Sequence, residues 1–403
     1  MEKKSNLLFI FALVYFFSPN GLGSLPDLPT TYLLKTVLKL TAAQASYFGA
    51  ISILGWAIKP LWGFISDAFP LFGSRRKSYL ILVSLLASVC WLVLALTQNY
   101  TIPLLLLFLT LSSFAYAFQD VVTDALMVEL GKQEHALAEF QSIQWLAVKI
   151  AQIITGFAGG VAAAKLSAQA TFGVTAFFPI IVAAVVLFLL KDGTPRVQFP
   201  ELKQKFKAAL ANRDFLLVAL FIFLWNFSPS YGLPLFYYLT DTLKFTPIFM
   251  GTLASIAAIS GAVGTIAFKF ISKRFSMRTL LTWSILIGGL ASLSSLAYLL
   301  PALQTNLALA RLVAVAEKII FGGLGMVAFL SILTFAAEKT EALAAGTIFA
   351  FLMSVYNLSS MGSSVLGGFL FDKIGLLPLI LLSTGTSLLI LVFIPFLKTE
   401  ENR

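Results

Sequence analysis

Two aspartates, Asp120 and Asp124, stand four residues apart in a long apolar segment. Residues at this spacing share one face of a helix, and an ionisable group inside a membrane is usually functional because its insertion is costly. Two like charges this close favour the binding of one proton, or of a substrate edge that donates hydrogen bonds. Both residues are therefore candidates for proton coupling and substrate binding. The alternative is a structural pair that locks helices near one membrane face.

Three cations in other apolar segments could bind a carboxylate. Arg311 and Lys318 are seven residues apart and share a helical face, with the small Ala314 between them. An arginine can hold a carboxylate in a bidentate manner. Lys149 lies near the middle of its segment, where a lone lysine must pair or lose its charge, and Asp120 is its expected partner. The alternative for Arg311 is a position at the membrane interface.

Glu317 points about 100° away from that cationic face and is a third candidate for proton coupling. The sequence contains no Gly-x-x-x-x-Gly-Lys-Ser/Thr loop, which argues against an ATP-driven cycle. It contains neither His-Glu-x-x-His nor Gly-x-Ser-x-Gly, and it has one histidine and one cysteine. We therefore expect no enzyme activity, no metal and no cofactor, and we expect any energy coupling to come from an ion gradient.

A short polar loop between two apolar segments contains three consecutive cations. Three cations in a tight loop between spanning helices are typical of the cytoplasmic side. A glycine in the preceding segment is expected to let two helix ends approach closely. The residues assigned to gating are Lys59, Gly63, Asp67, Arg75, Arg76 and Lys77. The alternative is an ordinary positively charged loop, with Lys59 extending its amine to the membrane interface.

The composition places these residues in a membrane. Of 403 residues, 59% are hydrophobic and 11% are charged, whereas soluble domains carry roughly 25% charged residues. The mean hydropathy is +0.92. A spanning helix needs about 20 mostly apolar residues, and twelve segments meet that length. They cover approximately 7–26, 41–66, 78–97, 101–130, 138–164, 171–190, 215–239, 247–272, 279–300, 306–336, 342–371 and 375–397.

One long polar connection, 191–214, separates an N-terminal half, 1–190, from a C-terminal half, 215–403, with six segments in each. Four short motifs recur between the halves at a separation of about 208 residues. They are Phe17-Ser18-Pro19 and Phe227-Ser228-Pro229, Leu38–Thr41 and Leu243–Thr246, Phe64-Ile65-Ser66 and Phe270-Ile271-Ser272, and Gly159-Gly160 and Gly367-Gly368. Six segments return the chain to the side on which it began, so the repeat is parallel. We expect an all-α protein of two parallel, pseudo-repeated six-helix bundles, which is the plan of transporters whose site lies between the halves.

Lysine and arginine gather in alternate loops, among them Lys3, Lys4, Lys132 and the connection 191–214. This bias predicts that both termini are cytoplasmic. The net charge of +10 therefore sets orientation and does not indicate nucleic-acid binding. No small-residue cleavage site follows the first apolar run, so we expect that run to be retained. We expect a monomeric multi-pass protein of the plasma membrane, which in bacteria is the inner membrane, surrounded by lipid.

The loop pattern Gly63-x-x-x-Asp67 followed by Arg75-Arg76-Lys77 resembles the loop between helices 2 and 3 of the major facilitator superfamily. More specifically, the sequence resembles the folate–biopterin transporter family. That similarity covers roughly helices 1–5. It rests on Trp56-Ala-Ile-Lys59-Pro60-Leu-Trp-Gly63-Phe-Ile-Ser-Asp67, Phe69-Pro70-Leu-Phe-Gly73, Arg75-Arg-Lys-Ser-Tyr79, Asp120-Val-Val-Thr-Asp124-Ala-Leu-Met-Val-Glu129 and Gln141-Ser142.

The resemblance implies a secondary transporter of folates or pterins, with protons as the coupling ion. In this hypothesis Asp120 and Asp124 face the pterin or carry the proton, while Arg311 and Lys318 hold the anionic glutamate tail. A related muropeptide- or acetyl-CoA-type permease shares the helix 2–3 region and the paired aspartates, and it remains an alternative. A non-transporting membrane receptor is a further alternative.

Overall fold

The computed structural model describes residues 2–133, 137–190, 204, 206–208, 210–338 and 345–397. Over these residues the chain is helical and forms no β-strand, as predicted. Nine helices in this part of the chain are long and apolar enough to cross a membrane. They are α6 (Lys77–Leu96), α7 (Ile102–Gln133), α8 (Leu137–Lys165), α9 (Ala168–Leu189), α13 (Pro247–Arg274), α14 (Met277–Ser294) with its continuation to Leu299, α16 (Leu307–Glu338), α17 (Ala345–Ile374) and α18 (Leu376–Leu389) with its continuation to Phe396.

The other three predicted spans, 7–26, 41–66 and 215–239, are helices broken into shorter pieces. The first consists of α1 (Glu2–Phe16), η1 (Leu22–Ser24), α2 (Asp27–Tyr32) and η2 (Leu33–Val37). The second consists of α3 (Ala42–Ser52), α4 (Leu54–Ala57) and α5 (Lys59–Ala68), and the third of α11 (Arg213–Asn226) and α12 (Gly232–Asp241). Short helices η3 (Ser295–Leu299), α15 (Pro301–Thr305) and η4 (Ile390–Phe396) complete the described elements.

The break in the first span has a steric cause. The chain makes a tight turn after α1, where a Cβ at Gly21 would lie 2.5 Å from the backbone oxygen of Tyr15. The helix then resumes and continues to Val37, so the predicted end of this span at residue 26 was too early. Most of the predicted connection 191–214 lies outside the described residues, and α11 begins near its end, at Arg213.

The predicted repeat has matching backbone geometry in the two halves. Lys39 and Lys244 both adopt a left-handed backbone conformation, with φ of 53° and 54°. Two residues later, Thr41 and Thr246 each accept a hydrogen bond at a helix N-terminus, from Gln44 in one case and Phe249 in the other. Side-chain oxygens at this position satisfy backbone N–H groups that the helix leaves free. The same local sequence therefore ends one helix and starts the next in both halves.

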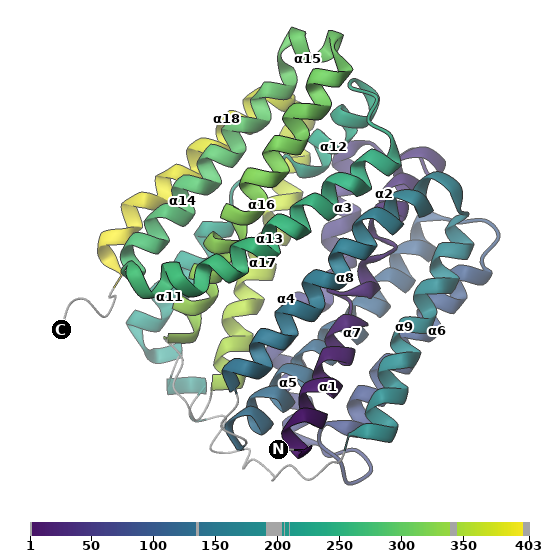
Figure 1. Cartoon of the computed structure of the whole chain (residues 1–403), viewed down its shortest axis with the longest axis vertical. Helices are drawn as coiled ribbons and strands as arrows, with labels where there is room; N and C mark the ends of the chain where they lie inside the picture. The colour runs from purple at the N-terminus through teal and green to yellow at the C-terminus, as the bar shows by residue number, and fades with distance from the viewer. Residues whose placement is uncertain are drawn as a thin grey trace.

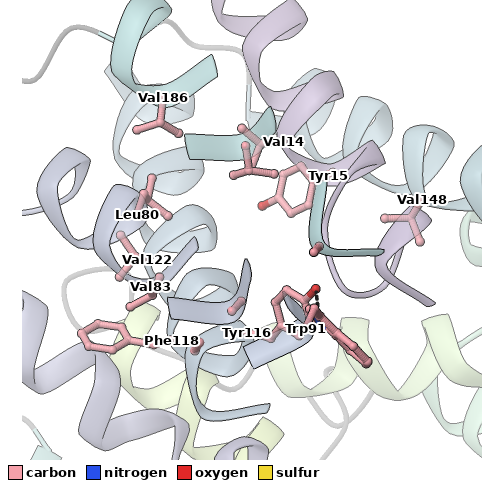
Figure 2. Packing of buried hydrophobic residues seen from close by; sticks show 14 of the residues in the cluster. Val14, Tyr15, Leu80, Val83, Trp91, Tyr116, Phe118, Val122, Val148 and Val186 are labelled. Atoms are coloured by element: carbon pink, nitrogen blue, oxygen red, sulfur yellow. Dashed lines mark hydrogen bonds between the residues drawn. The ribbon is translucent and has the colours of Figure 1, made fainter. Parts of the chain in front are cut away.

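The two halves form bundles that lie side by side, the N-terminal half in purple to teal and the C-terminal half in green to yellow (Figure 1). Each half has its own buried apolar core. In the N-terminal core, Val14 and Tyr15 of α1 face residues of α6 and α7, and the indole N–H of Trp91 donates to the Tyr116 hydroxyl at 2.9 Å (Figure 2). The start of α1 and the end of η4 lie toward one end of the molecule and α15 lies at the other; we call these the termini end and the α15 end (Figure 1).

Candidate functional site: a central cavity between two halves

The halves meet at the α15 end through a contact between α8 and α13 that three glycines make possible. A Cβ on Gly251 would lie 2.6 Å from Gly160 Cα and even closer to the backbone oxygen of Gly156. A Cβ on Gly160 would lie 2.7 Å from the Pro247 oxygen. No real side chain fits at such distances, so the two backbones touch only because these residues are glycine. We call this the glycine contact.

In each of the two repeated Gly-Gly pairs, the first glycine packs within its own half and the second faces the other half. Gly159 packs against Leu25 of its own half, and Gly367 packs against Ser230 of its own half. The following glycine in each pair faces the opposite half: Gly160 faces Pro247, and Gly368 lies where a Cβ would be 2.9 Å from Ser46. The motif that the sequence repeats therefore closes the α15 end twice, once between α8 and α13 and once between α3 and α17.

Polar contacts add to this closure. The Lys35 amine lies 2.6 Å from the Asp241 carboxylate of the other half, and the Tyr237 hydroxyl donates to the Leu40 backbone oxygen at 2.8 Å. The Asp241 side chain is 62% exposed, so this ion pair contributes little. Close backbone packing is the main feature that joins the halves at this end.

Three of the predicted gating residues form a charge cluster with Glu129 at the termini end; we define this cluster as Asp67, Arg75, Arg76 and Glu129. Both guanidinium groups are 3% exposed. Asp67 accepts from Arg75 at 2.9 Å and from Arg76 at 2.7 Å, and Glu129 accepts from Arg76 at 2.7 Å. Burial lowers the pKa of Arg76, but the nearby Asp67 and Glu129 outweigh it and raise the pKa, so this guanidinium remains charged.

Two other predicted gating residues lie beside this cluster. The Lys77 amine donates to the Leu190 backbone oxygen at 2.9 Å and so binds the C-terminal end of α9. Gly63 is buried, yet a Cβ there would meet only Val121, at 3.5 Å. That distance is an ordinary van der Waals contact, so the unusually close helix approach expected at Gly63 is not found.

Lys59 is buried and pairs with Asp120, whose carboxylate lies 2.6 Å from its amine. Each side chain is 10% exposed, and the Lys59 amine also lies 4.8 Å from the Trp56 ring centre. The sequence-based expectation that Asp120 pairs with Lys149 was therefore wrong. The alternative in which Lys59 extends to the interface was also wrong. The counterion of Asp120 comes from α5, which packs against α7.

Asp124 has its own partners, although it shares a helix with Asp120. The Tyr15 hydroxyl donates to its carboxylate at 2.6 Å, and the Gln144 amide donates at 3.4 Å. The two aspartates are thus held separately within the N-terminal half. A proton-coupling role for either residue stays a prediction.

A cavity of about 1030 Å³ lies between the halves. This volume is at the upper end of the roughly 300–1,000 Å³ typical of small-molecule sites. Its walls come from α2 and α8 of the N-terminal half and from α12, α13, α16 and α17 of the C-terminal half, among other elements. Four of the lining residues carry charge: Asp27, Lys149, Glu317 and Lys318.

The two lysines come from opposite halves. The Lys149 amine donates to Gln152 at 2.9 Å, and no carboxylate in the described part of the chain pairs with it. Lys149 extends across to α13, where a Cβ on Gly261 would lie 3.7 Å from its amine. Lys318 is 37% exposed and lies 3.3 Å from Glu317, which also accepts a hydrogen bond from Tyr298. An ammonium has three N–H donors, and each amine uses one in these contacts, so both keep donors for an anionic ligand.

Arg311, Asp120 and Asp124 do not line this cavity, as far as the described residues define it. The Arg311 guanidinium lies over the Phe249 ring, 5.4 Å from its centre. The structure thus brings Lys149 and Lys318 to one chamber and leaves Arg311 outside it. Sequence reasoning missed Asp27, because a hydropathy window ends at the first polar residue and the helix break hides the continuation of the first span.

This arrangement, with two parallel six-helix bundles and a cavity between them, defines a multi-pass membrane protein of the major facilitator fold. The nucleoside transporter NupG superposes with a TM-score of 0.73 at 16% identity, covering 98% of this chain and 99% of that one. A D-xylose–proton symporter superposes with a TM-score of 0.71 at 13% identity, covering 96% of each chain. At such identities the likeness concerns the fold alone.

Sequence comparison gives the family. The model of the BT1 family matches residues 20–392, and the chain belongs to that family of transporters, not of enzymes. The folate-biopterin transporter of Synechocystis is 30% identical over 406 residues, which cover 96% of this chain and 81% of the relative. Folate transporter 2 of Plasmodium falciparum is 28% identical over 407 residues, covering 95% and 86%. The family resemblance that the helix 2–3 and helix 4 motifs indicated is confirmed.

Proposed function

We propose that this protein moves folates or related pterins across the membrane by alternating access of its central cavity. The observation that carries the proposal is the pair of cavity lysines, Lys149 and Lys318, contributed by opposite halves. Folate combines a flat pterin ring with a tail that bears two carboxylates. A doubly anionic tail bound by one amine from each half would draw the halves together, and this is the differential binding that a conformational cycle needs.

Proton coupling is part of the proposal. Asp120, Asp124 and Glu317 each accept a hydrogen bond or an ion pair that protonation would weaken. The excess of lysine and arginine in alternate loops supports cytoplasmic termini, and the location we propose is the plasma membrane. In that orientation the α15 end faces outward, so the closed α15 end corresponds to a state not open to the outside. We expect the monomer to carry out the whole cycle.

The test is uptake of radiolabelled folate into proteoliposomes, with and without an imposed pH difference. We expect saturable uptake that the pH difference stimulates. Lys149→Gln and Lys318→Gln should each raise the KM for folate by at least about tenfold, because each removes a charge-assisted hydrogen bond. Lys269→Gln is the matched control, since Lys269 is an exposed lysine of α13 that does not line the cavity.

Uptake unchanged in both cavity variants would reject the lysine assignment. Competition adds a second criterion, in which unlabelled folic acid and pterin should displace the label. Displacement by an anhydro-muropeptide and not by pterin would overturn the proposed cargo.

A further inference from the structure

Asp27 presents an unpaired carboxylate to the central cavity. Its side chain is exposed and lines the cavity wall. Among the described residues, no side chain or backbone group bonds to its carboxylate; Thr31 bonds only to its backbone oxygen. The other lining acid, Glu317, is occupied by Tyr298 and Lys318. Asp27 is therefore the described acid of this cavity whose two carboxylate oxygens both lack a partner.

The position of Asp27 is fixed by the packing of the broken first span. Ser24, three residues earlier, shares a 2.9 Å hydrogen bond with Thr155 of α8. A Cβ on Gly159 of α8 would lie 3.2 Å from the Leu25 backbone oxygen and 3.9 Å from Pro29. Contacts on both sides of Asp27 thus hold it against the helix that carries Lys149. A binding group on a supported backbone of this kind keeps a defined geometry.

A carboxylate accepts two parallel N–H bonds in one plane. An unpaired carboxylate within a membrane protein is costly, so its expected partner is the cargo. A 2-amino-4-oxopteridine ring places two donors side by side, the 2-amino N–H and the ring N3–H. This edge matches the two oxygens of a carboxylate, whereas the glutamate tail of folate carries negative charge and would be repelled.

We propose that Asp27 recognises the pterin ring through these two donors, while Lys149 and Lys318 bind the anionic tail. This inference rests on the proposed function and deepens it by assigning the ends of the ligand. It moves the pterin contact from Asp120 and Asp124, whose carboxylates are already held by Lys59, Tyr15 and Gln144. Asp27 is then a specificity-determining residue that reads the 2-amino group.

The experiment compares pterin with lumazine, in which an oxygen replaces the 2-amino group. Each ring competes against radiolabelled folate for binding to the purified full-length protein. The wild type should prefer pterin by at least about tenfold, because lumazine turns one of the two donors into an acceptor. Asp27→Asn offers one acceptor and one donor, which match lumazine, so the preference should fall by at least about tenfold or reverse.

Three further variants keep the result interpretable. Asp27→Glu retains the carboxylate and should still prefer pterin. Asp27→Ser removes it without offering an amide and should bind both rings about equally; it replaces the asparagine variant if that protein is not recovered folded. Asp372→Asn, which changes an exposed aspartate of α17 outside the cavity lining, is the control and should leave the ratio of the two affinities unchanged.

An Asp27→Asn or Asp27→Ser protein that keeps the wild-type preference for pterin would overturn the inference. An equal loss of affinity for pterin and for lumazine would also overturn it, since Asp27 would then not distinguish the two rings. If the wild type binds folate and shows no preference between the rings, the inference fails while the proposed function stands. If the wild type binds no folate, the proposed function itself fails.

Discussion

The two ends of this molecule are stabilised by opposite kinds of interaction. At the α15 end the halves touch through backbone atoms at Gly156, Gly160 and Gly251, with little charge involved. At the termini end, the charge cluster of Asp67, Arg75, Arg76 and Glu129 lies entirely within the N-terminal half. One end has close packing between halves, and the other has ion pairs inside one half.

The difference suggests which interactions break during alternating access. Separating two packed backbones forfeits short-range dispersion contacts and leaves no buried ion without a partner. Separating a buried ion pair leaves an uncompensated charge, which is far more costly. A contact between halves made by glycines can therefore open and close, while a charge cluster within one half can remain intact throughout the cycle.

The largest effect is expected from breaking the charge cluster. Asp67→Asn leaves two buried guanidinium groups with the single carboxylate of Glu129, and we expect a loss of roughly 3 kcal/mol in stability. Thermal unfolding of the detergent-purified protein measures this. Asp372→Asn, which changes an exposed aspartate of α17, should have no measurable effect.

A second substitution tests the cause of that loss. Adding Arg75→Gln to Asp67→Asn removes one of the excess charges and should recover part of the stability. If the single variant is as stable as the wild type, the buried guanidinium groups do not depend on Asp67.

The next effect concerns the glycine contact. Gly251→Val would place a side chain into the backbone of Gly156 and Gly160, so the α15 end should no longer close. We expect uptake to fall on the order of 100-fold, because the closed state is depopulated by a steric clash. A cysteine at Ser255, which packs against Gly156, should become reactive to a thiol reagent in a Cys90→Ser background.

The matched control for this variant is Gly288→Val. Nothing lies within 4 Å of a Cβ at Gly288, so uptake and cysteine reactivity should be unchanged. If Gly251→Val takes up folate as the wild type does, the glycine contact is not required for transport.

Much of this architecture follows from the sequence because hydropathy and local capping act over short distances. Twelve apolar segments predicted the spans, and the recurring motifs that contain Lys39 and Lys244 predicted a repeat, in which both lysines adopt the same backbone conformation. Asp67 and Arg75, which belong to the loop pattern, form an ion pair, and their role in gating stays a prediction. In each case the residues that carry the pattern lie within a few positions of the helix or turn that they specify.

The cavity could not be predicted in the same way, because it depends on how separate helices face each other. The helices of Asp120 and Lys149, α7 and α8, are consecutive, which suggested that these two residues pair. The packing of α5 against α7 instead brings Lys59 to Asp120. Asp27 escaped notice because the span that contains it is interrupted. Charge and spacing identify the groups, and only the packing of helices assigns their partners.

A smaller effect is expected within the N-terminal half. Asp120→Asn removes the counterion of the buried Lys59 and should cost about 2 kcal/mol in stability, less than the cluster variant because the Trp56 ring still faces the amine. The double variant Lys59→Met with Asp120→Asn should recover much of the loss, as a double-mutant cycle of unfolding free energies would show. Additive losses would indicate that the pair is not coupled.

The same double variant separates structure from proton coupling. If Asp120 carries the proton, folate exchange between the two sides should persist while stimulation by a pH difference disappears. If the pair is structural, both activities should remain. The measurement is exchange against net uptake in the same proteoliposomes.

The smallest effect is expected at Arg311. Its guanidinium lies over Phe249 and outside the cavity lining in the described chain, so Arg311→Gln should cost only about 0.5–1 kcal/mol in stability, the value of a cation–π contact. The KM for folate should change less than about twofold, against at least about tenfold for Lys318→Gln on the same helix. A KM shift in Arg311→Gln as large as that in Lys318→Gln would show that the guanidinium reaches the ligand in another state of the cycle. Arg311 and Lys318, which are seven residues apart, would then bind the anionic tail together, as their spacing in the sequence first suggested.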